Sequence, residues 1–257
     1  MTLAIGDDSQ NRQPSAGLET DNYVATALAT AEPYSDAEYL AIVLGAAVQA
    51  QDAGDYGIAA ALVIRGQNTE LISVGRNGLL SARDPLGHAE VNAIRGIQSV
   101  LASQRTGRAL HVPPWTQQVP LGSATSAVFF RPAQPGRPTG AIESVLYASL
   151  EPCPMCTVAI ISSRIDRVII AAPDEQGGAL APERFAGLPR AWRSLASQQG
   201  LSADYASPES TVAPIPAELA ARLSRAFSST KDARDAEVSQ GVLPHGDIAA
   251  AIAELAP

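Results

Sequence analysis

Apolar residues recur at helical spacing directly after a capping motif at residue 35. Ser35 and Glu38 have the spacing of a capping box, in which the serine oxygen and the carboxylate satisfy free N–H groups at a helix start. Apolar side chains over 39–50 then lie three and four positions apart, which predicts a helix that ends near Gly54. Residues 1–34 are polar and acidic without a steady period, so we expect an extended or frayed leader there.

Two short runs with the character of β-strands come next, at 58–66 and 70–77, and turn-forming residues separate them. This pattern predicts a β-hairpin. The following periodic stretch, 88–104, carries an apolar stripe at helical spacing and predicts a helix with His88 in its first turn. The first half of the chain therefore has the order helix, hairpin, helix.

In the second half, prolines and glycines surround one apolar run in the stretch 105–143, which we interpret as a long insertion. A strand at 144–150, a helix at 153–164 and a strand at 167–172 follow. The whole order indicates a three-layer α/β domain. From 173 to 257, helix-like segments alternate with loops, which predicts a helical C-terminal extension.

Composition and charge narrow the class of protein. The 257 residues are 46% hydrophobic, enough to bury a sizeable core. The net charge of −8 disfavours extended binding to a phosphate backbone, so we expect nucleic acid to be an unlikely partner. The longest apolar runs fall far short of the roughly 18 residues of a membrane-spanning helix. The N-terminal residues lack the basic region of a secretory signal, so we expect a cytoplasmic protein without a membrane partner.

The candidate chemistry lies in two motifs, HAE at 88–90 and CPMC at 153–156, each at a predicted helix start. A Cys-x-x-Cys pair in a first helical turn is favoured as thiolate by the free N–H groups and the helix dipole. Two thiolates and the imidazole of His88 make three ligands for a tetrahedral Zn²⁺, which leaves a position for water, as in catalytic zinc sites. Zinc lowers the pKa of such a water towards about 7, and Glu90 can carry its proton to a leaving nitrogen.

These motifs resemble a known group of enzymes. The pattern H-x-E … P-C-x-x-C is the signature of zinc deaminases. The stretches DPLGHAEVNAIR (84–95) and LYASLEPCPMCTVAIISSRIDRVI (146–169) resemble the cytidine deaminase-like superfamily, above all its guanine, cytosine and tRNA adenosine deaminases. The resemblance covers residues 35–172, which we interpret as the deaminase core. It implies a three-layer α/β/α sandwich with a mixed sheet, and commonly a homodimer.

The resemblance also implies the site. It gives zinc as the cofactor, with three protein ligands: His88, Cys153 and Cys156. Glu90 is then the proton shuttle. Asn77 matches the asparagine that hydrogen-bonds the substrate, and the backbone N–H of Ala89 meets a ring carbonyl or ring nitrogen. The implied function is hydrolytic deamination, by zinc-bound hydroxide, of a small heterocyclic amine, a nucleobase or nucleoside, with a guanine-type purine favoured. The alternatives are a tRNA adenosine deaminase and a catalytically silent, zinc-stabilised binding domain.

Several alternatives stay open at the level of single residues. A Cys-x-x-Cys pair alone is also typical of redox proteins. His111 or His245 would close the metal site if either were a fourth ligand, whereas both also suit solvated loops. Asn77 is also a common turn residue. Three arginines near the motifs suit either phosphate binding or plain solvent exposure: Arg76, Arg83 and Arg95.

The chain departs from the family pattern in two respects, and both make its substrate harder to infer from the resemblance. His88 and Cys153 are 65 residues apart in the sequence (153 − 88), and the stretch 105–143 accounts for the excess over the family's compact spacing. The region after 172 does not resemble the family's tails, which often line the substrate pocket. The substrate is therefore the property that the sequence predicts least well.

Overall fold

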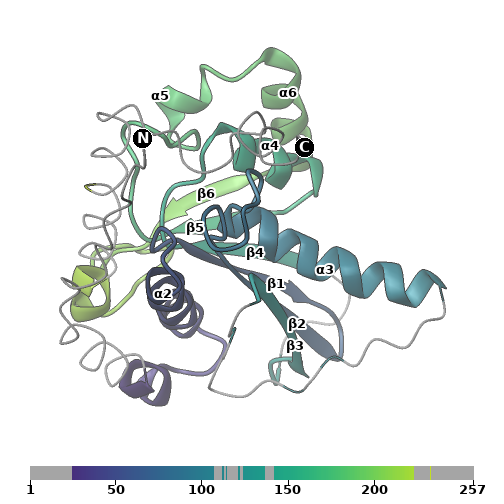
Figure 1. The fold of residues 1–257 in the computed structure, drawn as a ribbon, viewed down its shortest axis with the longest axis vertical. Helices are drawn as coiled ribbons and strands as arrows, with labels where there is room; N and C mark the ends of the chain where they lie inside the picture. Colours follow the sequence, from purple (N-terminus) through teal and green to yellow (C-terminus); the bar gives the residue numbers. More distant parts are fainter. Residues whose placement is uncertain are drawn as a thin grey trace, which may run out of the picture.

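The computed structural model of the chain describes residues 25–106, 112, 114, 121, 124–136, 142–222 and 232. Within these residues a single sheet lies between helices, with α2 on one face and α3 and α4 on the other (Figure 1). This is the expected α/β sandwich of three layers. None of the described helices combines the length and apolar character that crossing a membrane requires.

The sheet has six strands in the order β3-β2-β1-β4-β5-β6. Their bounds are β1 Ala59–Arg65, β2 Thr69–Arg76, β3 Ser126–Pro132, β4 Glu143–Ala148, β5 Arg167–Ile170 and β6 Ser202–Tyr205. Neighbours from β3 to β4 are antiparallel, whereas β4, β5 and β6 are parallel. The sheet is therefore mixed, and the expected hairpin is the pair of β1 and β2.

Helix α2 (Asp36–Asp52) begins where the capping motif predicts. The Ser35 hydroxyl oxygen accepts a hydrogen bond from the Glu38 N–H at 3.2 Å. The Glu38 carboxylate in turn accepts from the Tyr34 N–H at 2.6 Å, one residue earlier than in the usual capping box. After the helix, Gly54 has φ +85°, a left-handed conformation that favours glycine at a helix end.

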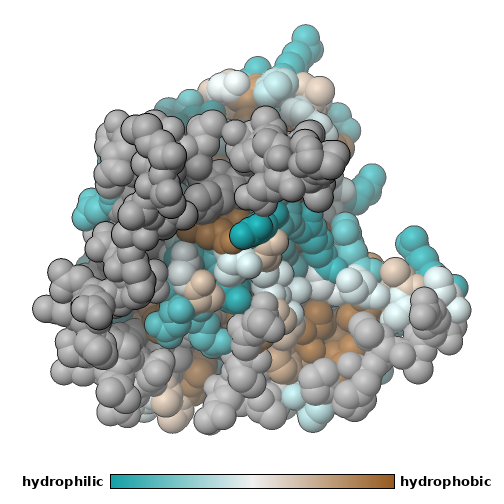
Figure 2. All heavy atoms as spheres, viewed as in Figure 1, coloured by the Kyte–Doolittle hydropathy of each residue, from teal (hydrophilic) through white to brown (hydrophobic). Residues whose placement is uncertain are grey.

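Helices α3 (Ala89–Thr106) and α4 (Pro154–Ser162) cover the other face of the sheet. His88 is the residue immediately before α3 instead of part of its first turn. Figure 2 shows apolar surface (brown) between α3 and the strands beside it. On this face, Ile64 and Leu71 lie opposite each other on β1 and β2 and are only partly buried.

Helix α3 lies in direct backbone contact with β2. A β-carbon at Gly75 would lie 2.3 Å from the Ala89 carbonyl oxygen and 2.4 Å from the Ala93 nitrogen. A β-carbon at Gly96 of α3 would lie 2.2 Å from the Ser73 Oγ of β2. A side chain at Gly75 would push the start of α3 away from the sheet, and one at Gly96 would collide with Ser73.

Two stretches expected to lie outside the sheet contribute strands to it. The stretch 105–143, interpreted as an insertion, contains β3, which pairs with β2 along its length. The extension 173–257, expected to be helical, contains α5 (Pro182–Phe185) and α6 (Arg190–Gln199) but also β6, which pairs with β5. The division into core and extension stays a prediction, but the sheet crosses that boundary.

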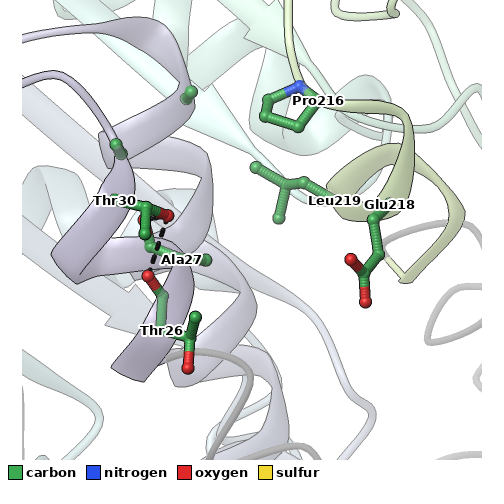
Figure 3. Close-up of a pocket in the computed structure, with 8 residues that line it drawn as sticks. Thr26, Ala27, Thr30, Pro216, Glu218 and Leu219 are labelled. Carbon is green, nitrogen blue, oxygen red and sulfur yellow. Dashed lines mark hydrogen bonds between the residues drawn. The ribbon is translucent and has the colours of Figure 1, made fainter.

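Residues 25–30, within the expected leader, form a short helix instead of an extended or frayed segment. Leu28 packs against the core on the α2 face of the sheet. Figure 3 shows a pocket between this short helix and residues 216–219, lined mainly by alanines, threonines, Pro216 and Leu219. Because α3 and α4 cover the opposite face, this pocket is separate from the motifs at the starts of those helices.

The end of the sheet far from the start of α3 carries a buried ion-pair network. Arg65, Glu70 and Arg131 lie opposite one another on β1, β2 and β3. Glu70 accepts from Arg65 at 3.1 Å and from Arg131 at 2.5 Å, and Arg131 also pairs with Glu38 at 3.0 Å. The Tyr39 hydroxyl donates to Glu70 at 2.7 Å. The side chains of this network therefore satisfy one another and tie α2 to the sheet.

Candidate metal centre

His88, Cys153 and Cys156 converge although they are far apart in the sequence. The three possible ligand atoms all lie within 4.8 Å of one another. The His88 Nδ1 is 3.6 Å from the Cys153 sulfur and 3.5 Å from the Cys156 sulfur. A nitrogen and a sulfur bound to one tetrahedral zinc, at about 2.0–2.1 and 2.3 Å, are separated by about 3.6 Å. The donor set and its spacing therefore fit zinc.

Two helix starts hold these side chains. Cys153 is the N-cap residue of α4, with extended backbone at φ −68° and ψ 170°, and Pro154 follows at a position where its missing N–H costs nothing. Cys156 lies in the first turn of the same helix. The carbonyl oxygen of His88 accepts a hydrogen bond from the Asn92 N–H at 2.9 Å, as the residue that caps a helix start does. The rigid ends of α3 and α4 thus place the three ligand side chains.

The pKa values of the two cysteine thiols shift in opposite directions. A hydrogen bond from Cys156 lowers the pKa of Cys153 to about 4, and the same bond raises the pKa of the Cys156 thiol. Burial opposes the charged form of His88, but the neighbouring Cys153 thiolate outweighs it and raises the pKa of His88. One thiolate and one adjacent thiol form an electron-rich pocket for a soft divalent cation, whose binding releases the remaining proton.

Glu90 lies against this group. It is 4% exposed, and its Oε2 lies 3.3 Å from the Cys156 sulfur. Burial, followed by the charge of the Cys153 thiolate, raises the pKa of Glu90 above its ordinary value. A carboxyl group with a raised pKa beside a metal position can both accept and return a proton near neutral pH.

The two candidate substrate contacts lie at the same end of the sheet. Ala89 is the first residue of α3 and is fully buried. Asn77 directly follows β2 and is 1% exposed. Its Oδ1 accepts from the Leu79 N–H at 3.0 Å, so the oxygen of the side chain also shapes the turn after β2. The roles of Asn77 and Ala89 towards a substrate stay predictions.

Among the arginines near the motifs, Arg76 and Arg95 form ion pairs with carboxylates. Arg76 is 1% exposed and forms an ion pair with Asp55, so solvent exposure is the wrong reading for this residue. Arg95 forms an ion pair with Asp84 at 2.5 Å. Asp84 Oδ1 also accepts from the Leu86 N–H, which shapes the loop before His88. The open alternatives His111 and His245 lie outside the described residues.

Sequence reasoning missed Glu151, the residue two positions before Cys153. Its side chain is fully buried and accepts the N–H groups of Leu180 and Ala181, each at 2.9 Å. Arg184 and the Tyr205 hydroxyl also donate to it, at 2.5 and 2.9 Å. These donors lower the pKa of Glu151 although burial opposes them. An acidic residue directly after the apolar strand 144–150 is the one signal in the sequence that could have identified it.

Comparison with known protein families identifies the family to which this chain belongs. A family model for the cytidine and deoxycytidylate deaminase zinc-binding region matches residues 33–172. The chain belongs to this family. Membership confirms the superfamily inferred from the two motifs, and it confirms zinc as the cofactor of a deaminase family. The geometry of His88, Cys153 and Cys156 agrees with that metal.

Curated relatives include two tRNA-specific adenosine deaminases. That of Bacillus subtilis (strain 168) is 28% identical over 143 residues, which make up 56% of this chain and 65% of the relative. That of Haemophilus influenzae is 27% identical over 145 residues, 56% of this chain and 62% of the relative. The match therefore spans less than two thirds of the length of either relative.

A solved structure of the guanine deaminase from Nitrosomonas europaea is also similar. It is 19% identical in sequence, covers 88% of this chain and 97% of its own, and has a TM-score of 0.41.

Proposed function

We propose that this protein is a zinc-dependent hydrolase that removes the amino group of a small nucleobase or nucleoside, with a guanine-type purine as the favoured substrate. The observation that carries the proposal is the convergence of His88, Cys153 and Cys156 beside the buried carboxylate of Glu90. A structural zinc site has no need of an additional buried carboxylate, whereas hydrolytic deamination requires a group that moves protons.

The site residues have two kinds of role: three would bind the metal, and one transfers protons. His88, Cys153 and Cys156 would hold the metal, which when bound acts as a Lewis acid and makes water nucleophilic at neutral pH. Glu90 takes one proton from the water as the water oxygen bonds to the ring carbon that carries the amine, and it delivers this proton to the neighbouring ring nitrogen as the ring C=N bond becomes single. Glu90 then moves the remaining hydroxyl proton to the amine nitrogen, the bond from carbon to the amine breaks as the C=O bond forms, and ammonia leaves. Burial of Glu90 keeps bulk water from competing for the proton.

Two observations support a small substrate. The net charge of −8 opposes the approach of a polyanion and has no such effect on a neutral base. The motifs HAEVNAIR and EPCPMC resemble those of guanine deaminases. Asn77 and the N–H of Ala89, both at the metal end of the sheet, are our candidates for binding the ring.

A screen for ammonia release tests the proposal. Guanine, adenine, cytosine and their nucleosides are incubated with the zinc-loaded protein, and Glu90→Gln provides an isosteric variant that cannot carry the proton. We expect turnover of guanine, and a loss of about 10²- to 10⁴-fold in kcat in Glu90→Gln with zinc retained. Turnover that survives Glu90→Gln, or purified protein that binds no zinc, would reject the mechanism.

The second candidate is deamination of adenosine in tRNA, because the curated relatives named above carry that activity. A tRNA anticodon stem-loop is therefore one arm of the same screen. Turnover of the stem-loop and of no small substrate would replace the favoured substrate class. If the protein binds zinc but deaminates no substrate in the screen, the result favours the third alternative, a zinc-stabilised binding domain. The expected homodimer is checked on the same samples by light scattering.

A further inference from the structure

A closed loop, residues 77–87, joins β2 to His88. The Gly78 N–H donates to the Gly87 carbonyl at 2.9 Å, which brings the two ends of the loop together. The side-chain amide of Asn92, on α3, donates to the carbonyls of Arg76 and Gly87 at 2.9 and 3.2 Å. The ends of the loop are therefore fixed to the helix that carries Glu90.

The middle of the loop is held by a buried carboxylate from another part of the chain. Asp55, in the turn after α2, has a side chain with no exposed surface. Its Oδ1 accepts from the N–H groups of Leu80 and Ser81, at 2.7 and 3.0 Å. Its Oδ2 accepts from the Arg76 Nη1 at 3.2 Å.

Arg76 extends this contact to the residues before β3. Its Nε donates to the Ala124 carbonyl at 3.1 Å, and its backbone N–H donates to the Thr125 carbonyl at 2.9 Å. Nη1 also lies 3.4 Å from the carbonyl oxygen of Asn77. One buried ion pair thus joins three segments around Asn77: the turn at 53–58, the loop 77–87 and residues 124–125.

Burial of two charges costs free energy that their mutual attraction repays only when hydrogen bonds satisfy the remaining polar atoms. Asp55 directs one oxygen wholly to backbone N–H groups of the loop, and Arg76 directs donors to backbone carbonyls. A buried carboxylate that accepts main-chain N–H groups fixes a loop more rigidly than an exposed pair, because water competes little for the carboxylate oxygens.

We propose that Asp55 and Arg76 are positioning residues for the deamination site. Together they hold the loop 77–87 so that Asn77 and His88 keep the separation that a bound substrate requires. The effect on turnover rests on the function proposed above. The effect on the loop itself does not, and it is measured separately.

The test compares two isosteric changes at opposite ends of β1 and β2. Asp55→Asn keeps the shape of the side chain, but it removes the charge and turns an NH₂ group towards Arg76. Glu70→Gln is the matched control, since it makes the same change in the ion-pair network at the far end of the sheet. Each variant is assayed for zinc content, thermal unfolding, kcat and KM, and amide hydrogen exchange.

We expect Asp55→Asn to lower kcat/KM by about 10- to 100-fold with zinc retained, since a shift of about 1 Å in a group that positions the substrate can cost about 10²-fold. The amides of Leu80 and Ser81 should exchange faster in this variant, while those of α3 keep their protection. Glu70→Gln should leave kcat/KM and both loop amides unchanged. Equal kinetics in the two variants, or unchanged exchange at Leu80 and Ser81 in Asp55→Asn, would overturn the proposal.

A second variant covers the case in which Asp55→Asn does not fold. Arg76→Lys keeps the positive charge beside Asp55 but loses the donor to the Ala124 carbonyl. It should show the same faster loop exchange to a smaller degree, and a folded Arg76→Lys with wild-type exchange and kinetics would reject the proposal. If the wild-type protein deaminates no substrate, the proposed function fails, whereas the exchange measurement still decides whether the pair holds the loop.

Discussion

The two ends of the sheet both bury charged side chains, but they use them differently. At the far end, Glu70 binds Arg65 and Arg131 on the neighbouring strands, so the charges satisfy one another. At the metal end, Asp55 and Glu151 accept main-chain N–H groups of loops. A closed network of side chains stabilises the sheet itself, whereas a carboxylate that binds a loop's backbone determines where that loop lies.

The difference indicates that the two ends of the same strands have different roles. The far end can lose free energy of folding without any change at the metal, because its contacts run between α2 and the strands. At the metal end, replacing Asp55 or Glu151 should change the positions of the loops around the site. The following predictions test that difference, from the largest expected effect to the smallest.

Cys156→Ser should abolish deamination. Serine has nearly the same shape as cysteine but lacks the thiolate that zinc prefers, so the metal loses one of three protein ligands. We expect metal analysis to find little zinc, and ammonia release to fall below detection. Met155→Leu, a half-buried neighbour within the same motif, is the control and should keep both. Full zinc occupancy in Cys156→Ser would contradict the ligand set.

Glu70→Gln should destabilise the fold by about 3 kcal/mol, the lower end of the range for buried pairs, because Arg65 and Arg131 lose their shared carboxylate but keep Glu143 and Glu38. Denaturant unfolding measures the change. Zinc content and KM should match the wild-type protein under conditions in which the variant is folded. A loss of zinc in this variant would show that the two ends are not independent.

Glu151→Gln should affect both stability and activity. The change removes the charge opposite Arg184, which is partly exposed, so we expect a loss of about 3 kcal/mol, the lower end of the range for buried pairs. It also loosens the connection from Cys153 to residues 180–184. Glu183→Gln is the control: it breaks an exposed pair with the same Arg184 and should cost only about 0–1 kcal/mol. Equal losses in the two variants would contradict the role of burial.

The far end should make stability sensitive to alkaline pH. Burial, followed by the charge of Glu70, raises the pKa of Tyr39. Burial likewise raises the pKa of Tyr147 on β4, whose hydroxyl accepts from Arg65 at 3.0 Å. Above about pH 10 the unfolded chain ionises these tyrosines while the folded chain keeps them protonated, so stability falls by up to about 1.4 kcal/mol per pH unit for each. Unfolding midpoints from pH 9 to 11 measure the slope. An identical slope in Tyr39→Phe would exclude Tyr39 as a cause.

Much of the fold could be predicted from local patterns. Ser35 and Glu38 mark the start of α2, and two short strand-like runs separated by turn-forming residues mark β1 and β2. The convergence of His88, Cys153 and Cys156 was also predictable, since HAE and CPMC are short motifs placed at two helix starts. In each of these cases the information lies within a few consecutive residues.

The remaining features depend on partners far apart in the sequence. β3 is a short run among prolines and glycines, and only its pairing with β2 identifies it as part of the sheet. β6 is short and half polar, and its partner β5 lies more than 30 residues earlier. Arg76 and Glu151 carry charges that a sequence places in solvent by default. Their burial depends on Asp55 and Arg184, which local patterns do not connect to them.

The absence of a side chain at Gly75 has a consequence for engineering this protein. The start of α3 is separated from β2 by less than the width of a methyl group. Even an alanine there would lift the turn that bears Glu90, and its carboxyl would move relative to Cys153 and Cys156 at the start of α4. A library that seeks new substrate specificity should therefore keep residue 75 fixed, whichever loop positions it varies. Gly75→Ala should alter the spacing between the Glu90 carboxyl and the Cys156 sulfur.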